Sequence, residues 1–92
     1  MPRILIFGQY VIYFWSSEDG KPAHVHVAIK KPKQNSTKFW LTKSGGCELS
    51  ANDGSIPAKD LKRIQRFIAL NHSLILEAWK NQFDNKDIRF YK

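Results

Sequence analysis

The sequence is poor in cysteine, in long apolar runs and in the motifs that mark common enzyme classes. Its single cysteine, Cys47, has no partner for an internal disulfide, which fits a reducing compartment. The apolar run at residues 4–7 is too short for a signal peptide or a membrane span, so we expect a cytoplasmic protein with no membrane association. The sequence has no Walker loop, dinucleotide-binding glycine pattern, serine-nucleophile elbow or Cys-x-x-Cys pair, and we expect no cofactor.

Acidic residues are also scarce. The 92 residues include 15 lysines and arginines but only 8 aspartates and glutamates, which gives a formal net charge of +7. The excess is concentrated in residues 1–46, where acids are fewest. Such a balance favours a polyanion or an acidic protein as partner, although it also serves solubility. The length predicts a single domain over residues 1–92, and the oligomeric state stays open.

Local patterns predict strands first and helix afterwards. We expect strands at Arg3–Phe7, Tyr10–Trp15, Ala23–Lys30, Thr37–Lys43 and Cys47–Ser50, with a further edge-strand candidate at Ile88–Tyr91. From Pro57 to about Gln82 the apolar residues recur at helical spacing, and Asn71-His72-Ser73 marks a kink or the junction of two helices. The prediction is an α+β fold: an antiparallel meander sheet of three to five strands, followed by one long kinked helix or two helices packed on one face.

The most specific stretch is Pro22–Val27, which carries two of the three histidines. Side chains alternate faces along a strand, so His24 and His26 share one face while Val25 and Val27 share the other. The apolar helix positions Leu61, Ile64, Ile68 and Ile75 are the natural cover for the valine face. We therefore expect the histidine pair on the opposite, more polar face, open to solvent.

Several motifs in this order resemble a known family. They are Phe7-Gly8, Pro22-Ala23-His24-Val25-His26, Ile56-Pro57 and Ile75-x-x-x-Trp79. Together they cover most of the chain, which resembles the bacterial domain of unknown function family 4160 (DUF4160). The resemblance implies a small sheet-plus-helix protein of bacterial origin, often encoded beside a second small protein in a toxin–antitoxin-like arrangement. It implies no established reaction.

The first hypothesis for function is RNA binding, with or without cleavage. His24 and His26 would act as a general acid/base or phosphate-contacting pair in a metal-independent ribonuclease. The phosphate backbone would be held by a basic hairpin of Lys30, Lys31, Lys33, Lys38 and Lys43, with Trp40 among them as a stacking surface. The helix adds Lys59, Lys62, Arg63 and Arg66, which we interpret as a solvated face.

Two alternatives stay open. In one, the protein is a non-catalytic module for an acidic partner protein, such as a cognate antitoxin-like protein, or for DNA; the histidines then hydrogen bond to Tyr10, Tyr13 or Ser17 and serve the fold. In the other, His24 and His26 bind a metal ion with help from Glu18, Asp19 or Glu48. His72 falls on the apolar helical stripe, so it is poorly placed to be a third ligand. Trp15 and Trp79 are expected in the core or an interface, and Cys47 is not expected to be a nucleophile.

Overall fold

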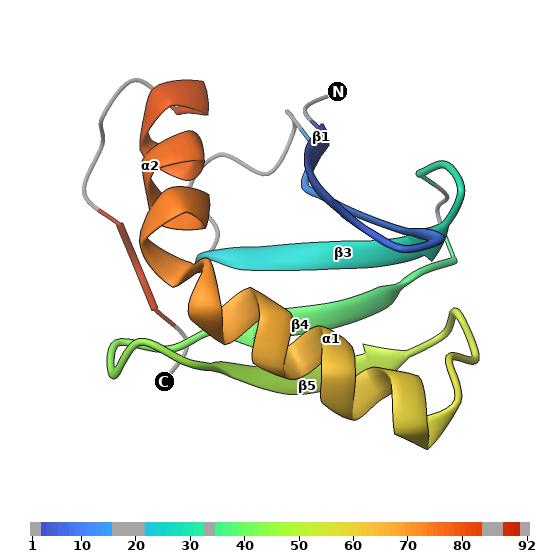
Figure 1. The fold of residues 1–92 in the computed structure, drawn as a ribbon. Helices are drawn as coiled ribbons and strands as arrows, with labels where there is room; N and C mark the ends of the chain where they lie inside the picture. Colours follow the sequence, from blue (N-terminus) through green and yellow to red (C-terminus); the bar gives the residue numbers. More distant parts are fainter. Residues whose placement is uncertain (1–2, 16–21, 33–34, 84–87, 91–92) are drawn as a thin grey trace.

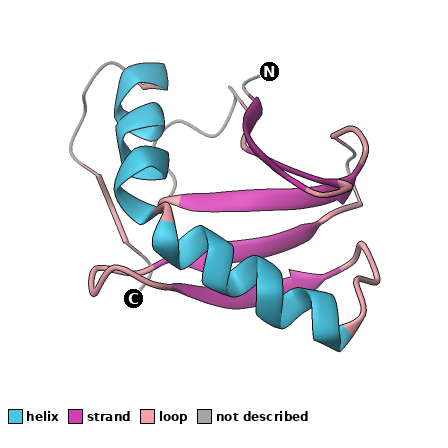
Figure 2. Ribbon diagram, viewed as in Figure 1, coloured by secondary structure: helices cyan, strands magenta, loops and turns pink. Residues whose placement is uncertain are grey.

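A computed structural model describes residues 3–15, 22–32, 35–83 and 88–90 (Figure 1). Within them, one antiparallel sheet has the order β1-β2-β3-β4-β5, formed by β1 (Arg3–Phe7), β2 (Tyr10–Tyr13), β3 (His24–Ile29), β4 (Thr37–Leu41) and β5 (Cys47–Asn52). Two helices follow, α1 (Ala58–Leu70) and α2 (His72–Gln82) (Figure 2). The α+β fold and the meander order are confirmed, and of the two helical alternatives the structure has two helices.

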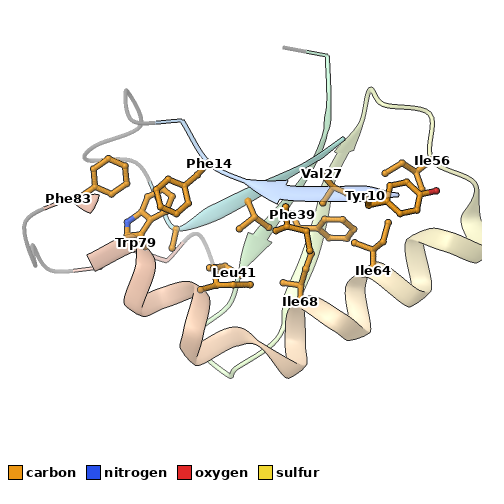
Figure 3. Close-up of a cluster of buried hydrophobic side chains, with 14 residues drawn as sticks. Tyr10, Phe14, Val27, Phe39, Leu41, Ile56, Ile64, Ile68, Trp79 and Phe83 are labelled. Carbon is orange, nitrogen blue, oxygen red and sulfur yellow. The ribbon is translucent and has the colours of Figure 1, made fainter. Parts of the chain in front are cut away.

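Both helices lie on one face of the sheet. Ile64, Ile68 and Ile75 are fully buried in one cluster with Val25 and Val27. Figure 3 shows side chains of this cluster filling the space between the helices and the strands. The predicted cover of the valine face is therefore confirmed. His24 and His26, which alternate with these valines, belong to the other side of the sheet, over which neither described helix lies.

The helical segment divides at Asn71. This residue has φ −107° and ψ 19°, ends α1 and precedes α2. Its side-chain Nδ2 donates to the carbonyl oxygen of Phe67 at 2.9 Å, a local bond that competes with helix continuation. The polar triplet that interrupts the apolar period thus separates two helices.

The fold differs from the prediction in several strand bounds. β2 ends at Tyr13 and β4 at Leu41, each two residues before the predicted end. β5 extends to Asn52 because the Asn52 side chain anchors its end: its Oδ1 accepts from Thr37 Oγ1 at 2.6 Å and from the Ile56 amide at 3.0 Å. Residues 88–90 form no strand, and Tyr91 lies outside the described residues. The Ala23 amide instead donates one backbone hydrogen bond to the Arg89 carbonyl at 2.8 Å. No helix in the described part of the chain has the length and apolar character that crossing a bilayer requires.

Candidate functional site

The histidine pair lies where strand alternation predicts. Val25 and Val27 face the helices, whereas His24 and His26 lie on the opposite side of β3. The two imidazole centroids are 5.1 Å apart, and their planes are nearly perpendicular, at 87°. Adjacent rings in this arrangement meet edge to face, the geometry that aromatic pairs prefer.

His24 is fully buried, which corrects the expectation that both rings would be open to solvent. Its Nδ1 donates to the Pro22 carbonyl oxygen at 2.7 Å. Trp79 of α2 and Trp40 of β4 approach the ring edge to face, with centroids 5.3 and 5.7 Å away. The expectation failed because Trp79, itself only 4% exposed, reaches the first residue of β3 from the helical layer. Strand alternation alone does not include this contact.

His26 is only partly buried. Its ring stacks on Tyr13 of the neighbouring strand, with centroids 5.5 Å apart and 28° between the planes. Its Nδ1 is 3.2 Å from the hydroxyl of the buried Ser36. Stacking and this hydrogen bond hold the ring in one orientation while part of it stays accessible. Of the pair, His26 is therefore the ring that can contact a ligand.

The predicted structural partners of the histidines are partly wrong. Tyr13 contacts His26 through ring stacking. Tyr10 lies on the helix side of β2 and donates from its hydroxyl to Asp60 Oδ2 at 2.6 Å. That hydrogen bond, together with burial, raises the pKa of Tyr10 above its usual value of 10.0. Ser17 lies outside the described residues.

Trp40 lies on the polar side of its strand, as predicted. It pairs across β3 and β4 with His24, and Lys38 pairs with His26 in the same way. The Lys38 Nζ sits 4.0 Å from the centre of the Trp40 ring, a cation–π contact. Both side chains are partly exposed. We call this side of β2, β3 and β4 the aromatic face: Tyr13, Trp15, His24, His26, Lys38 and Trp40. Tyr13 and His24 are fully buried within it, and the other four side chains are partly exposed.

The lysines of the predicted basic hairpin do not form one cluster. Lys30 and Lys31 are exposed just beyond the end of β3, whereas exposed Lys43 follows the far end of β4. Because β3 and β4 are antiparallel, these two positions lie at opposite ends of the strand pair. Only Lys38 lies between them, on the aromatic face, and Lys33 is outside the described residues. The lysines thus flank the face at its two ends.

No metal centre is formed by the described residues. His72 Nε2 donates to the Thr42 carbonyl oxygen at 2.8 Å, on the turn between β4 and β5, so it does not join the pair. Within the described ranges no three histidine, cysteine, aspartate or glutamate side chains gather closely enough to hold an ion. Glu48 pairs with Trp40 across β4 and β5, whereas Glu18 and Asp19 lie outside the described residues.

Cys47 is held in an unreactive form. Burial raises the pKa of its thiol to about 11, and its Sγ lies 3.4 Å from the Gln65 carbonyl oxygen, to which it donates. A thiol with this pKa is almost wholly protonated at neutral pH, and the thiolate is the nucleophilic form. The prediction that Cys47 is not a nucleophile agrees with this environment.

Sequence reasoning missed the neighbours that complete the aromatic face. Trp15 was expected in the core or an interface and was not linked to the histidines, but its ring centroid lies 5.4 Å from that of Tyr13 and 6.5 Å from that of His26. Ser36, whose hydroxyl lies 3.2 Å from His26 Nδ1, was not among the candidate residues. The alternation in β2 does place Tyr13 and Trp15 on one side. Their meeting with His26 depends on the β2–β3 register, in which Tyr13 opposes His26.

Comparison with known proteins gives one match. A protein-family model described as a domain of unknown function, DUF4160, matches residues 10–80, which include the aromatic face and both helices up to Lys80. No curated protein and no solved structure matches the chain.

Proposed function

The chain belongs to the DUF4160 family, whose function is unknown, and we propose that it is a module that binds single-stranded RNA on the aromatic face without cleaving it. The observation that carries the proposal is the Lys38–Trp40 pair. A cation 4.0 Å from an indole centroid, both partly exposed, offers a base a ring to stack on and a phosphate a charge to contact.

The surroundings of this pair support the same ligand. Trp15 and His26 extend the partly exposed ring surface across two neighbouring strands. Positive charge lies at both ends of the face, from Lys30 and Lys31 at one end and from Lys43 at the other. An RNA strand that crosses the face would pass these lysines where it leaves the face. Stacking on successive rings is tolerant of base identity, so the expected recognition has little sequence preference.

Cleavage by the histidine pair is disfavoured by the burial of His24. A mechanism with two imidazoles requires both rings to reach the ribose hydroxyl and the leaving oxygen. His24 has no exposed surface, and its Nδ1 is already committed to the Pro22 carbonyl. His26 alone then serves as a binding contact. If the protein cleaved RNA in EDTA and His26→Ala abolished cleavage, the non-catalytic part of the proposal would be wrong.

Binding is tested by anisotropy of a labelled oligouridine over a range of salt concentrations. Trp40→Ala should weaken binding by about 1–3 kcal/mol, the contribution of one stacked base. Lys38→Gln should lower the slope of log affinity against log salt by about 0.7, the value for one phosphate contact on a single strand. Lys80→Gln is the matched control, because it removes one exposed lysine from α2, in the helical layer.

Folding of each variant is checked by its circular dichroism and its unfolding midpoint. If Trp40→Ala and Lys38→Gln bind oligouridine as the Lys80→Gln control does, the aromatic face is not the RNA site. A cytoplasmic location and a cognate antitoxin-like partner stay predictions. The second is tested by co-expression with the product of the adjacent small gene, followed by measurement of the mass of the purified complex.

A further inference from the structure

Among the residues of α1, all of which the structure describes, the outer side carries cations and no acidic side chain. Its cations Lys59, Lys62, Arg63 and Arg66 are all exposed and recur at i, i+3, i+4 and i+7; we call them the α1 basic stripe. The helix has one acidic residue, Asp60, and its carboxylate is turned toward the sheet, where it accepts the Tyr10 hydroxyl at 2.6 Å. Like charges at these spacings oppose helix formation, so the stripe is unfavourable for the isolated chain.

The stripe continues into exposed leucines. Leu70 follows Arg66 by one helical turn and is 79% exposed, and Leu74 is 49% exposed one turn further along the chain. They are two of the four large hydrophobic side chains that are exposed among the described residues. The outer surface of α1 therefore changes from charged at Lys59 to apolar at Leu70, and Leu74 follows near the start of α2.

From these two observations we propose that the outer face of α1 docks an acidic segment of a partner protein, with acidic side chains on the stripe and apolar side chains on Leu70 and Leu74. Charge complementarity selects an acidic partner, and the leucines supply the apolar contact that protein interfaces have at their core. A phosphate backbone would match the stripe but has no apolar groups to cover the leucines. A single protein segment can supply both the acidic side chains for the stripe and the apolar side chains for the leucines.

A shallow groove beside the stripe supports the docking of side chains. It has a volume of about 420 Å³ and lies between α1 and the start of β5. Lys62, Gln65 and Arg66 line it from the helix, opposite Gly46 and Cys47. Two cations at its edge give a carboxylate of the partner a recess in which charge-assisted hydrogen bonds form. The face is separate from the aromatic face, because α1 covers the other side of the sheet.

The test uses a designed probe, because the partner is unidentified. The probe is a labelled helical peptide with glutamates at i, i+3, i+4 and i+7, followed by two leucines one turn apart. Its binding to the full chain is measured by anisotropy. We expect saturable binding that weakens about tenfold or more in Arg63→Glu/Arg66→Glu, because charge reversal turns attraction into repulsion. We also expect it to weaken by about tenfold in Leu70→Ser/Leu74→Ser.

Lys80→Glu is the control for the reversal of an exposed cation, since it reverses a cation on α2 away from the stripe. All substituted side chains are exposed, so the variants should fold, and the unfolding midpoint checks this. The proposal is overturned if the peptide does not bind, or if the leucine variant binds it as the wild type does. It is also overturned if a short RNA duplex binds the stripe more tightly than the peptide and displaces it. Because oligouridine binding reports the aromatic face, either proposal can fail while the other holds.

Discussion

Replacing His24 by alanine should strongly destabilise the protein. The imidazole is fully buried and is surrounded by the rings of His26, Trp40 and Trp79, with centroid distances between 5.1 and 5.7 Å. Its removal leaves a cavity among these rings and leaves the Pro22 carbonyl without its 2.7 Å hydrogen bond. Loss of a large buried side chain costs about 2–5 kcal/mol, and an unsatisfied buried acceptor about 1–3 kcal/mol.

We expect the sum to reach about 3–5 kcal/mol, since part of the cavity will collapse and water can reach the carbonyl. The free energy of unfolding of a natural domain is about 5–15 kcal/mol, so the variant should retain only part of the wild-type stability. The free energy of unfolding is measured by urea titration followed by tryptophan fluorescence. Two matched variants are measured in the same way as His24→Ala. His24→Phe keeps a ring but removes the hydrogen bond, and should cost about 1–3 kcal/mol.

His26→Ala removes a partly exposed ring of the same chemistry two residues away, and should cost about 1 kcal/mol. The reasoning therefore predicts a clear order, with His24→Ala the least stable variant. If His24→Ala and His26→Ala lost equal stability, or if His24→Ala unfolded within about 0.5 kcal/mol of the wild type, the structural role of His24 would be refuted.

Three further predictions follow from individual contacts. Asn52→Ala removes side-chain hydrogen bonds to Thr37 and to both backbone groups of Ile56, and should lower the free energy of unfolding by about 3 kcal/mol in urea titration; an unchanged midpoint would contradict this. Cys47, with a pKa of about 11, should react with iodoacetamide at pH 8 roughly a hundredfold more slowly than a free thiol, and a comparable rate would contradict its burial. Tyr10 has a raised pKa in the folded state, so its stabilising contribution is complete below pH 10 and is lost as the pH rises through the folded value. Tyr10→Phe should remove this alkaline loss from urea titrations at pH 9 to 12, and an identical profile in the variant would contradict the assignment.

The meander and the two faces of β3 follow from local pattern. Val25 and Val27 alternate with His24 and His26, and the stripe from Ile64 to Ile75 has the period of a helix, so the valine face of β3 is the one that the helices cover. These preferences agree with the packing, and the predicted faces are correct. The break between the helices also follows from local sequence, because the Asn71 side chain donates a hydrogen bond to the backbone carbonyl of Phe67.

The local sequence pattern could not predict which side chains of the site are exposed to solvent. His24 is buried by Trp79, which is distant in sequence, and only the packing of α2 against the sheet brings the two rings together. Lys30 and Lys43 belong to the same hairpin in sequence but are separated in space, because the length of β4 lies between them. Asp60 would offset one of the four positive charges of α1 if it faced solvent, yet its hydrogen bond to Tyr10 directs it inward.

The most direct test of the RNA-binding proposal is the fluorescence of Trp40 during titration with oligouridine. In a Trp15→Phe/Trp79→Phe background Trp40 is the only tryptophan, because the sequence contains three. Stacking of a base on the indole should quench its emission, with the same midpoint as the anisotropy of the labelled RNA. If the RNA binds while Trp40 emission stays constant, binding occurs elsewhere and the role assigned to the aromatic face is wrong.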